Sequence, residues 1–160
     1  MYSSEKRNDL LIGFMATLPF LWGKIASYFG YSWYKTLLSP ASVPPYWVEG
    51  LIWAFLCVCS AIAFTIITTA YKHVGYYRHV FFLFILCWGL TLLWPYLFFI
   101  HQTLAGALIN AIVLEFSILT LIIVLWKDAR IAALLLLPSL FWVAFEVYLN
   151  YQFLVLNEVM

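Results

Sequence analysis

The sequence predicts an all-α membrane protein, a bundle of five transmembrane helices, and two observations support this fold class. Of the 160 residues, 66% are hydrophobic and only 9% are charged. A soluble domain carries about 25% charged and about 45–50% apolar residues, so this chain lacks the charges for a polar surface. Five apolar stretches also approach the roughly 20 residues that a helix needs to cross a bilayer core. We therefore expect one domain, residues 1–160, whose excess apolar surface faces lipid.

The five apolar stretches give the expected helices in chain order. Helices are expected because backbone groups in lipid must find their hydrogen bonds within their own segment. The strands of a membrane barrel would alternate apolar and polar residues, and no such alternation is visible. The first stretch follows two basic residues, as in a secretory signal, but Pro19 and the aromatic residues after it favour a retained helix. The expected helices cover residues 10–29, 46–71, 80–100, 104–126 and 131–156.

The basic residues predict how the bundle is oriented. In the expected topology six of the eight Lys and Arg residues lie on the side of the amino terminus, and Lys24 and Lys35 lie toward the other side. Because basic residues accumulate on the cytoplasmic side, we expect a bacterial cytoplasmic membrane with the amino terminus inside, and an organelle membrane as the alternative. The net charge of +1 gives no indication of a nucleic-acid partner. The six residues are Lys6, Arg7, Lys72, Arg78, Lys127 and Arg130.

No motif in the chain indicates conventional catalysis or a metal site. The cysteines Cys57, Cys59 and Cys87 all lie inside apolar runs, where a disulfide framework does not fit. Residues two apart on a helix point to nearly opposite sides, so Cys57 and Cys59 are not a metal pair. We find no nucleophile–base constellation, and we expect a protein that is not a conventional enzyme.

The connection between the first two expected helices, residues 30–45, is the only one long enough for a structure of its own. It is rich in proline and aromatic residues, and proline fixes φ and lacks a backbone donor. We interpret this stiff loop as a lid over a cavity, and the alternative is an interfacial segment anchored by its aromatic side chains. The expected lid residues are Trp33, Tyr34, Pro40, Pro44 and Pro45.

Polar residues inside the expected helices form two stripes with helical spacing. Side chains at intervals of three and four residues share one helix face, and polar faces should turn away from lipid. Two mixed aromatic and polar stripes that face each other describe a cavity with a few polar anchors, and ordinary helix packing is the alternative. One stripe is Glu49, Trp53, Cys57 and Ser60, and the other is Trp142, Glu146, Asn150, Phe153 and Asn157.

Glu115 and Glu146 are ionisable residues deep in the fourth and fifth expected helices. Counted from the short turn between these helices, their depths differ by about 6 Å at 1.5 Å per residue. One hypothesis is that the two carboxyls share a proton and act as a proton relay. The alternative is that each is bonded to a neighbouring helix.

Three motifs occur in the order and spacing of a known family. Pro-Pro-Tyr-Trp-Val at 44–48, then Trp53, opens the second expected helix. Leu-Trp-Pro-Tyr-Leu-Phe-Phe at 93–99 ends the third, and Leu-Pro-Ser-Leu-Phe-Trp at 137–142, followed by Leu-Asn-Tyr at 149–151, lies in the fifth. In these motifs the chain resembles, over essentially its whole length, the translocator protein (TspO/MBR) family. That family is also called tryptophan-rich sensory protein or peripheral benzodiazepine receptor.

The resemblance implies a five-helix bundle, often dimeric, with a ligand cavity capped by the first loop. Family members bind porphyrins and other tetrapyrroles, sterols and synthetic aromatic ligands, and their proposed activities include transport, stress sensing and light-dependent porphyrin breakdown. The resemblance also implies that Trp53 and Trp142 face the ligand. Ala107 and Ala111 form a small-xxx-small pair that suits a helix interface.

The chain departs from the family pattern at several positions near the expected ligand. Cys87 and Thr91 replace a glutamine and an asparagine, and Ser139 replaces a tyrosine. Glu146 replaces a small residue, so that a carboxyl projects where the family leaves room for ligand. Tyr151 lacks the basic residue that the cholesterol motif requires. These departures favour a basic or hydrogen-bonding ligand as an alternative to porphyrin or sterol.

From these observations we expect a membrane receptor or transport protein that binds a planar hydrophobic molecule, porphyrin-like or sterol-like, inside the bundle. The first alternative is a proton-coupled or cation transporter that uses Glu115 and Glu146. The second is a light-dependent enzyme that degrades tetrapyrroles. The expected partners are lipid, the small ligand and a second copy of the chain. The expected ligand-binding residues are Trp47, Trp53, Cys87, Thr91, Trp94, Trp142, Glu146 and Asn150.

Overall fold

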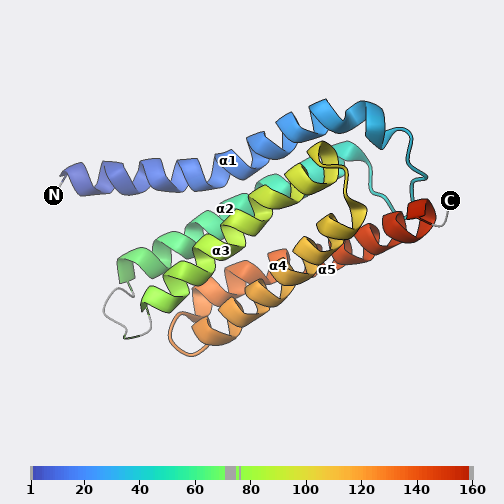
Figure 1. Cartoon of the computed structure of the whole chain (residues 1–160). Helices are drawn as coiled ribbons and strands as arrows, with labels where there is room; N and C mark the ends of the chain where they lie inside the picture. Colours follow the sequence, from blue (N-terminus) through green and yellow to red (C-terminus); the bar gives the residue numbers. More distant parts are fainter. Residues whose placement is uncertain (1, 71–74, 76, 159–160) are drawn as a thin grey trace.

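The computed structural model describes residues 2–70, 75 and 77–158, and these residues form helices and loops without any strand. Figure 1 shows α2 to α5 side by side in a bundle, with α1 along one side and its amino-terminal part diverging from the others. The helices are α1 (Tyr2–Tyr34), α2 (Tyr46–Ala70), α3 (Tyr77–Pro95), the short π-helix η1 (Tyr96–Ile100), α4 (Leu104–Leu125) and α5 (Arg130–Glu158).

The observed helices match the expected ones except at α1 and at the end of the third. Helix α1 continues to Tyr34, so Trp33 and Tyr34 belong to its last turn and the first loop covers only residues 35–45. The expectation of a loop over residues 30–45 was wrong at its start. Gly30 does not end the helix and instead lies against Phe99. The third expected helix is divided at Pro95 into α3 and η1.

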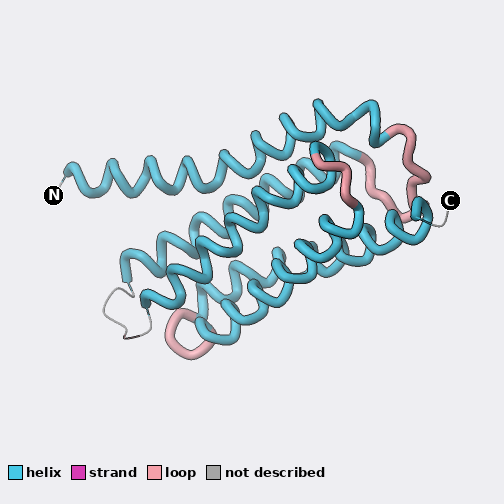
Figure 2. Tube along the Cα trace, viewed as in Figure 1, coloured by secondary structure: helices cyan, strands magenta, loops and turns pink. Residues whose placement is uncertain are grey.

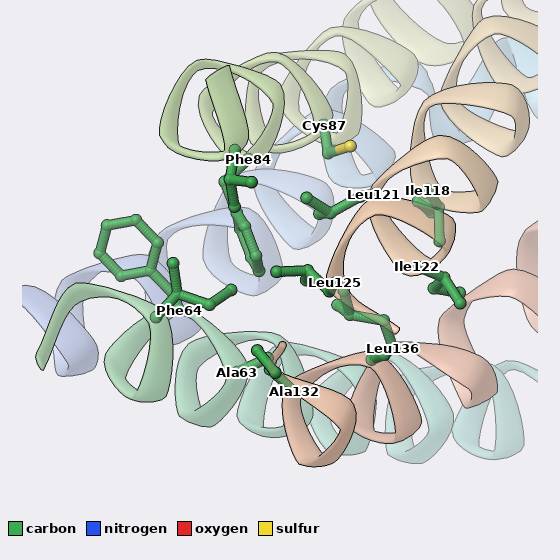
Figure 3. Close-up of a cluster of buried hydrophobic side chains, with 14 of the residues drawn as sticks. Ala63, Phe64, Phe84, Cys87, Ile118, Leu121, Ile122, Leu125, Ala132 and Leu136 are labelled. Atoms are coloured by element: carbon green, nitrogen blue, oxygen red, sulfur yellow. The ribbon is translucent and has the colours of Figure 1, made fainter. Parts of the chain in front are cut away.

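One half of the bundle is a packed hydrophobic core. Helix α4 packs against α3 and α5, and α2 packs against α1 and α5. Figure 3 shows the core side chains between α2, α3, α4 and α5, with Ala63 and Ala132 where α2 and α5 meet. Ala63 and Ala132 are both fully buried, and such small residues let helix backbones approach closely. Large side chains such as Phe64, Phe84 and Leu121 fill the remaining space.

The other end of the bundle carries the first loop and the link between η1 and α4, as Figure 2 shows in pink. Here the backbone of α1 lies directly on η1. A Cβ atom built on Gly30 would lie 2.5 Å from the carbonyl oxygen of Phe99 and 2.6 Å from its Cβ. Glycine is therefore required for this approach. Trp22 joins α1 to α3, because its indole Nε1 donates to the carbonyl of Leu92 at 2.8 Å.

The outer surface of the bundle is apolar, as a membrane protein requires. Within the described residues four helices are long and apolar enough to cross a membrane. Large side chains on these helices point outward, for example Phe141 with 71% and Ile123 with 65% of its surface exposed. Exposed apolar area on this scale, carried by helices of membrane-spanning length, indicates contact with lipid. The protein is thus an all-helical, multi-pass membrane protein, and the four helices cover Tyr46–Ala70, Tyr77–Ile100, Leu104–Leu125 and Arg130–Asn157.

The small-residue pair Ala107 and Ala111 packs inside the chain. The two residues are 0% and 1% exposed, so they form an interface of α4 with its neighbours in the bundle. They therefore give no support to contact with a second copy.

The Gly30 contact predicts a pair of substitutions with opposite effects. Gly30→Ala forces α1 away from η1 and should lower stability by about 1–3 kcal/mol, the usual cost of overpacking. Gly23→Ala on the same helix meets no atom within 4 Å and should be neutral or stabilising by up to about 1 kcal/mol, because alanine favours helix. Thermal unfolding in detergent, followed by circular dichroism, measures both. Equal melting temperatures for the two variants would contradict the close approach.

Candidate functional site

A cavity of about 800 Å³ lies between α1, α2, α3, η1, α5 and the first loop. Sites for drug-sized molecules have volumes of about 300–1,000 Å³ and are mostly apolar with a few polar groups, so the cavity has ligand-binding dimensions. Eleven of its lining residues are aromatic, and they come from five helical segments. These are Phe20, Tyr28, Tyr31, Tyr34, Tyr46, Trp53, Trp94, Phe98, Phe99, Trp142 and Phe153.

Glu146 of α5 is the central polar group of the cavity wall. Its carboxyl oxygen Oε1 accepts hydrogen bonds from two indoles, Nε1 of Trp53 at 2.9 Å and Nε1 of Trp142 at 2.8 Å. The Glu146 side chain is only 6% exposed. Trp142 lies four residues earlier on the same helix, whereas Trp53 comes from α2. A buried indole N–H requires an acceptor, so this one oxygen fixes both rings and joins α2 to α5.

A second polar pair lies nearer the first loop. The indole of Trp94 donates to Oδ1 of Asn150 at 3.3 Å, and Nδ2 of Asn150 donates to the carbonyl of Glu146 at 2.7 Å. The Trp94 ring stacks on Phe98, with ring centroids 5.1 Å apart and planes inclined by 19°. The hydroxyl of Thr91 donates to the carbonyl of Cys87 at 2.9 Å, which leaves its methyl group for packing.

The wall formed by α1 contains a lysine that sequence reasoning did not assign to the site. Nζ of Lys24 lies 3.7 Å from the centroid of the Tyr46 ring, a cation–π contact between α1 and α2. It also lies 3.2 Å from the position that a Cβ of Gly50 would occupy, and it attracts the carboxyl of Glu49 electrostatically. Lys24 and Glu49 both line the cavity.

A sequence signal for the α1 wall was present. Five side chains of α1 recur at intervals of four, three, four and three residues, which places them on one helix face. The expected loop began at residue 30, so the last two of them were assigned to the loop and the stripe was missed. The five residues are Phe20, Lys24, Ser27, Tyr31 and Tyr34, and all line the cavity.

The first loop covers the cavity and is held to α5 by side chains. Asn157 binds both backbone groups of Leu38: the Leu38 N–H donates to Oδ1 at 2.8 Å, and Nδ2 donates to the Leu38 carbonyl at 3.1 Å. The hydroxyl of Ser42 donates to Oε1 of Gln152 at 2.7 Å. Val43 of the same loop lines the cavity. These two polar contacts, called latches below, hold the first loop against α5.

The lid residues expected from the sequence have different positions. Tyr34 and Pro44 line the cavity, and Pro40 is buried in the loop. Trp33 packs edge to face on Phe98 with centroids 5.6 Å apart, so it supports the cavity wall from behind. Pro45 is exposed. Its carbonyl accepts the first hydrogen bonds of α2, which the N–H groups of residues 48 and 49 donate.

The structure brings six of the eight expected ligand-binding residues to the cavity. Trp47 and Cys87 are not among its lining residues. Trp47 is 68% exposed, because it lies two residues from Glu49 and points to nearly the opposite side of α2. Cys87 lies one turn deeper on α3 than Thr91 and belongs to the packed core. The six are Trp53, Thr91, Trp94, Trp142, Glu146 and Asn150.

Glu115 lies apart from this group. It does not line the cavity, and its buried Oε2 has no hydrogen-bond partner among the residues that the structure describes. The hydrogen bonds of the Glu146 side chain go to Trp53 and Trp142, and no interaction joins the two carboxyls.

Comparison with a family model and comparison with individual known proteins agree with each other. The model of the TspO/MBR family matches residues 14–156. The tryptophan-rich protein TspO of Bacillus cereus is 27% identical over 95% of this chain and 98% of its own length. The protein of the same name from Chlorobaculum tepidum is 32% identical over 79% of this chain and 80% of its own. The human translocator protein is 29% identical over 76% of this chain and 73% of its own.

The latch between Asn157 and Leu38 makes a prediction about lid dynamics. Asn157→Ala removes the acceptor of the Leu38 N–H, and a lost hydrogen bond of about 1 kcal/mol corresponds to roughly fivefold more frequent opening. Hydrogen–deuterium exchange of the peptide covering residues 35–45 should accelerate accordingly. Val155→Ala, on the lipid-exposed side of the same helix, serves as the control and should leave the exchange unchanged. Equal exchange in both variants would show that Asn157 does not hold the loop.

Proposed function

Because the chain belongs to the TspO/MBR family, we propose that it binds a planar hydrophobic ligand in the cavity beneath its first loop. The ligand class is porphyrin-like, another tetrapyrrole or sterol-like, and binding serves transport or stress signalling. The observation that supports this proposal is the cavity of about 800 Å³ with its aromatic lining. Aromatic rings offer flat apolar surfaces on which a planar molecule stacks.

The ligand enters when the first loop opens. The described hydrogen bonds between this loop and α5 are few, those of Leu38 with Asn157 and of Ser42 with Gln152. Breaking them exposes the cavity at the end of the bundle where the carboxyl terminus lies (Figure 1). Loops of low local stability are the elements that open around ligands, so the lid can control both entry and release.

We also propose that α1 is a fifth membrane span, with the amino terminus in the cytoplasm. Figure 1 shows the amino terminus, the end of α2 and the turn between α4 and α5 at one end of the bundle. Arg78, Lys127 and Arg130 lie at this end, which agrees with the accumulation of basic residues on the cytoplasmic side. Lys72 lies outside the described residues. The membrane would be a bacterial cytoplasmic membrane or, as the alternative, an organelle membrane. The homodimer stays a prediction.

The transporter alternative has weaker support. A relay through Glu115 and Glu146 needs the two carboxyls to exchange a proton, and the structure contains no hydrogen bond between them. Light-dependent degradation of a tetrapyrrole remains compatible with the cavity, because Trp53, Trp94 and Trp142 all line it. Such an activity would build on the same binding site.

A cavity-filling substitution tests the proposal. Gly23 lines the cavity, and a Cβ built there meets no atom within 4 Å, so the phenyl ring of Gly23→Phe can occupy the ligand space without a clash at its base. Binding of protoporphyrin IX, measured by quenching of tryptophan fluorescence in detergent, should weaken by more than about tenfold, or 1.4 kcal/mol. Every tryptophan is retained in this variant.

Gly89→Phe is the matched control for this experiment. Gly89 is exposed on α3, outside the cavity lining, and a Cβ there also meets no atom within 4 Å. The control should bind as the unsubstituted protein does. If both variants bind equally well, or if neither the protein nor the control binds protoporphyrin or a sterol, the cavity is not the ligand site.

A further inference from the structure

We propose that the cavity selects a planar aromatic ligand that carries a basic nitrogen, and that Glu146 and Glu49 bind this nitrogen. This inference rests on the proposed function, and it adds the chemical group that the ligand presents to the protein. It follows from the hydrogen bonds and charges of the cavity wall.

The indole and hydroxyl groups in the deep wall of the cavity already donate their hydrogen bonds to acceptors within the protein. The indoles of Trp53 and Trp142 both donate to Glu146, and the indole of Trp94 donates to Asn150. The Thr91 hydroxyl donates to a carbonyl of its own helix. In this deep wall the second N–H of the Asn150 amide is the donor left over. For any further hydrogen bond there, a ligand that offers only acceptors, such as a carboxylate, would have to break one of these bonds. Breaking it would leave a buried polar group unsatisfied, which is costly.

Acceptor atoms, in contrast, remain available. Both indoles bind the same oxygen of Glu146, and within the described residues its other oxygen, Oε2, has no donor. The Glu49 carboxyl lines the same cavity. Glu49 lies four residues before Trp53 on α2, so both side chains share one helix face and the second carboxyl lies one turn nearer the first loop. The wall thus presents two carboxyl groups along one side.

The charged groups of the cavity also favour a cation. The wall has two carboxyl groups, Glu49 and Glu146, and one amine, Lys24. That amine is already placed over the Tyr46 ring at 3.7 Å and is attracted to Glu49. Lys24 is the only basic side chain among the described lining residues, so Glu146 has no basic partner of its own there. A ligand cation would supply one.

A basic nitrogen fits Glu146 in either protonation state of the carboxyl. A carboxylate accepts a hydrogen bond from a ligand ammonium group. A carboxylic acid transfers its proton to a free ligand amine, and the same carboxylate–ammonium pair results. The aromatic rings of Trp53 and Trp142 beside it strengthen the binding of a delocalised cation through cation–π attraction.

Three probes of similar shape and different charge test this inference. They are 9-aminoacridine, which is basic, anthracene, which is neutral, and anthracene-9-carboxylate. Their affinities are measured with the full-length protein in a neutral detergent. We expect 9-aminoacridine to bind at least about tenfold more tightly than the carboxylate, since a charge-assisted hydrogen bond is worth about that factor or more.

Matched substitutions test whether the two carboxyls cause the preference for the cationic probe. Glu146→Gln keeps an acceptor for both indoles and should reduce the ratio of cation to anion affinity about tenfold, with anthracene binding changed less than about twofold. Glu49→Gln should reduce the same ratio by a smaller factor, and it supplies the test if Glu146→Gln fails to fold. Glu115→Gln removes a carboxyl outside the cavity and should leave the ratio unchanged.

The outcomes separate this inference from the proposed function. If anthracene binds and Gly23→Phe abolishes its binding, but the charged probes bind equally or Glu146→Gln and Glu49→Gln leave their ratio intact, the inference is wrong and the cavity remains a ligand site. If Glu115→Gln lowers the ratio as much as Glu146→Gln does, the effect is a general one of charge and the inference is wrong. If none of the three probes binds while protoporphyrin IX does, the inference is wrong and the proposed function stands; if protoporphyrin IX also fails to bind, both proposals fail.

Discussion

The structure depends on one buried carboxyl oxygen that accepts two indole hydrogen bonds. Trp53 of α2 and Trp142 of α5 both donate to Oε1 of Glu146. Each ring is large and apolar, and each would bury an unsatisfied N–H without this oxygen. The shared acceptor keeps the two rings in the cavity wall, and it links α2 to α5 on the side where the helices are separated by a cavity. Beside the cavity this polar contact holds α2 and α5 together, as apolar packing does in the rest of the bundle.

In the rest of the bundle, the sizes of the residues along each helix decide how closely the helix backbones approach one another. Where α2 and α5 carry alanines such as Ala63 and Ala132, the backbones approach and large side chains fill a solid core. Toward the first loop the same helices carry tryptophan and phenylalanine, whose bulk separates the backbones and leaves the cavity between them. Gly30 permits the close approach of the α1 backbone to Phe99 of η1 at that end. One half of the molecule is therefore packed, and the other half is suited to bind a ligand.

The stripes on the second and fifth helices could be predicted because helical spacing alone places Glu49 with Trp53, and Trp142 with Glu146. Two residues were misassigned: Trp47 is exposed, as its spacing of two residues from Glu49 already indicated, and Cys87 is in the core, because spacing does not say which neighbour a face meets. The contribution of α1 was missed since Tyr31 and Tyr34 were placed in a loop. The glycine at position 30 suggested a helix end, but its role is a close approach to Phe99, which comes from a segment distant in the sequence.

The sequence by itself determined the membrane class, the order of the helices and the presence of polar groups that must avoid lipid, because each of these depends on composition and local periodicity. Only the tertiary structure decided which polar groups meet. It paired Glu146 with Trp53 across two helices, placed Asn157 on Leu38 and separated Glu115 from the cavity. These pairings depend on the rotation of each helix about its axis, and that rotation is set by packing against its neighbours.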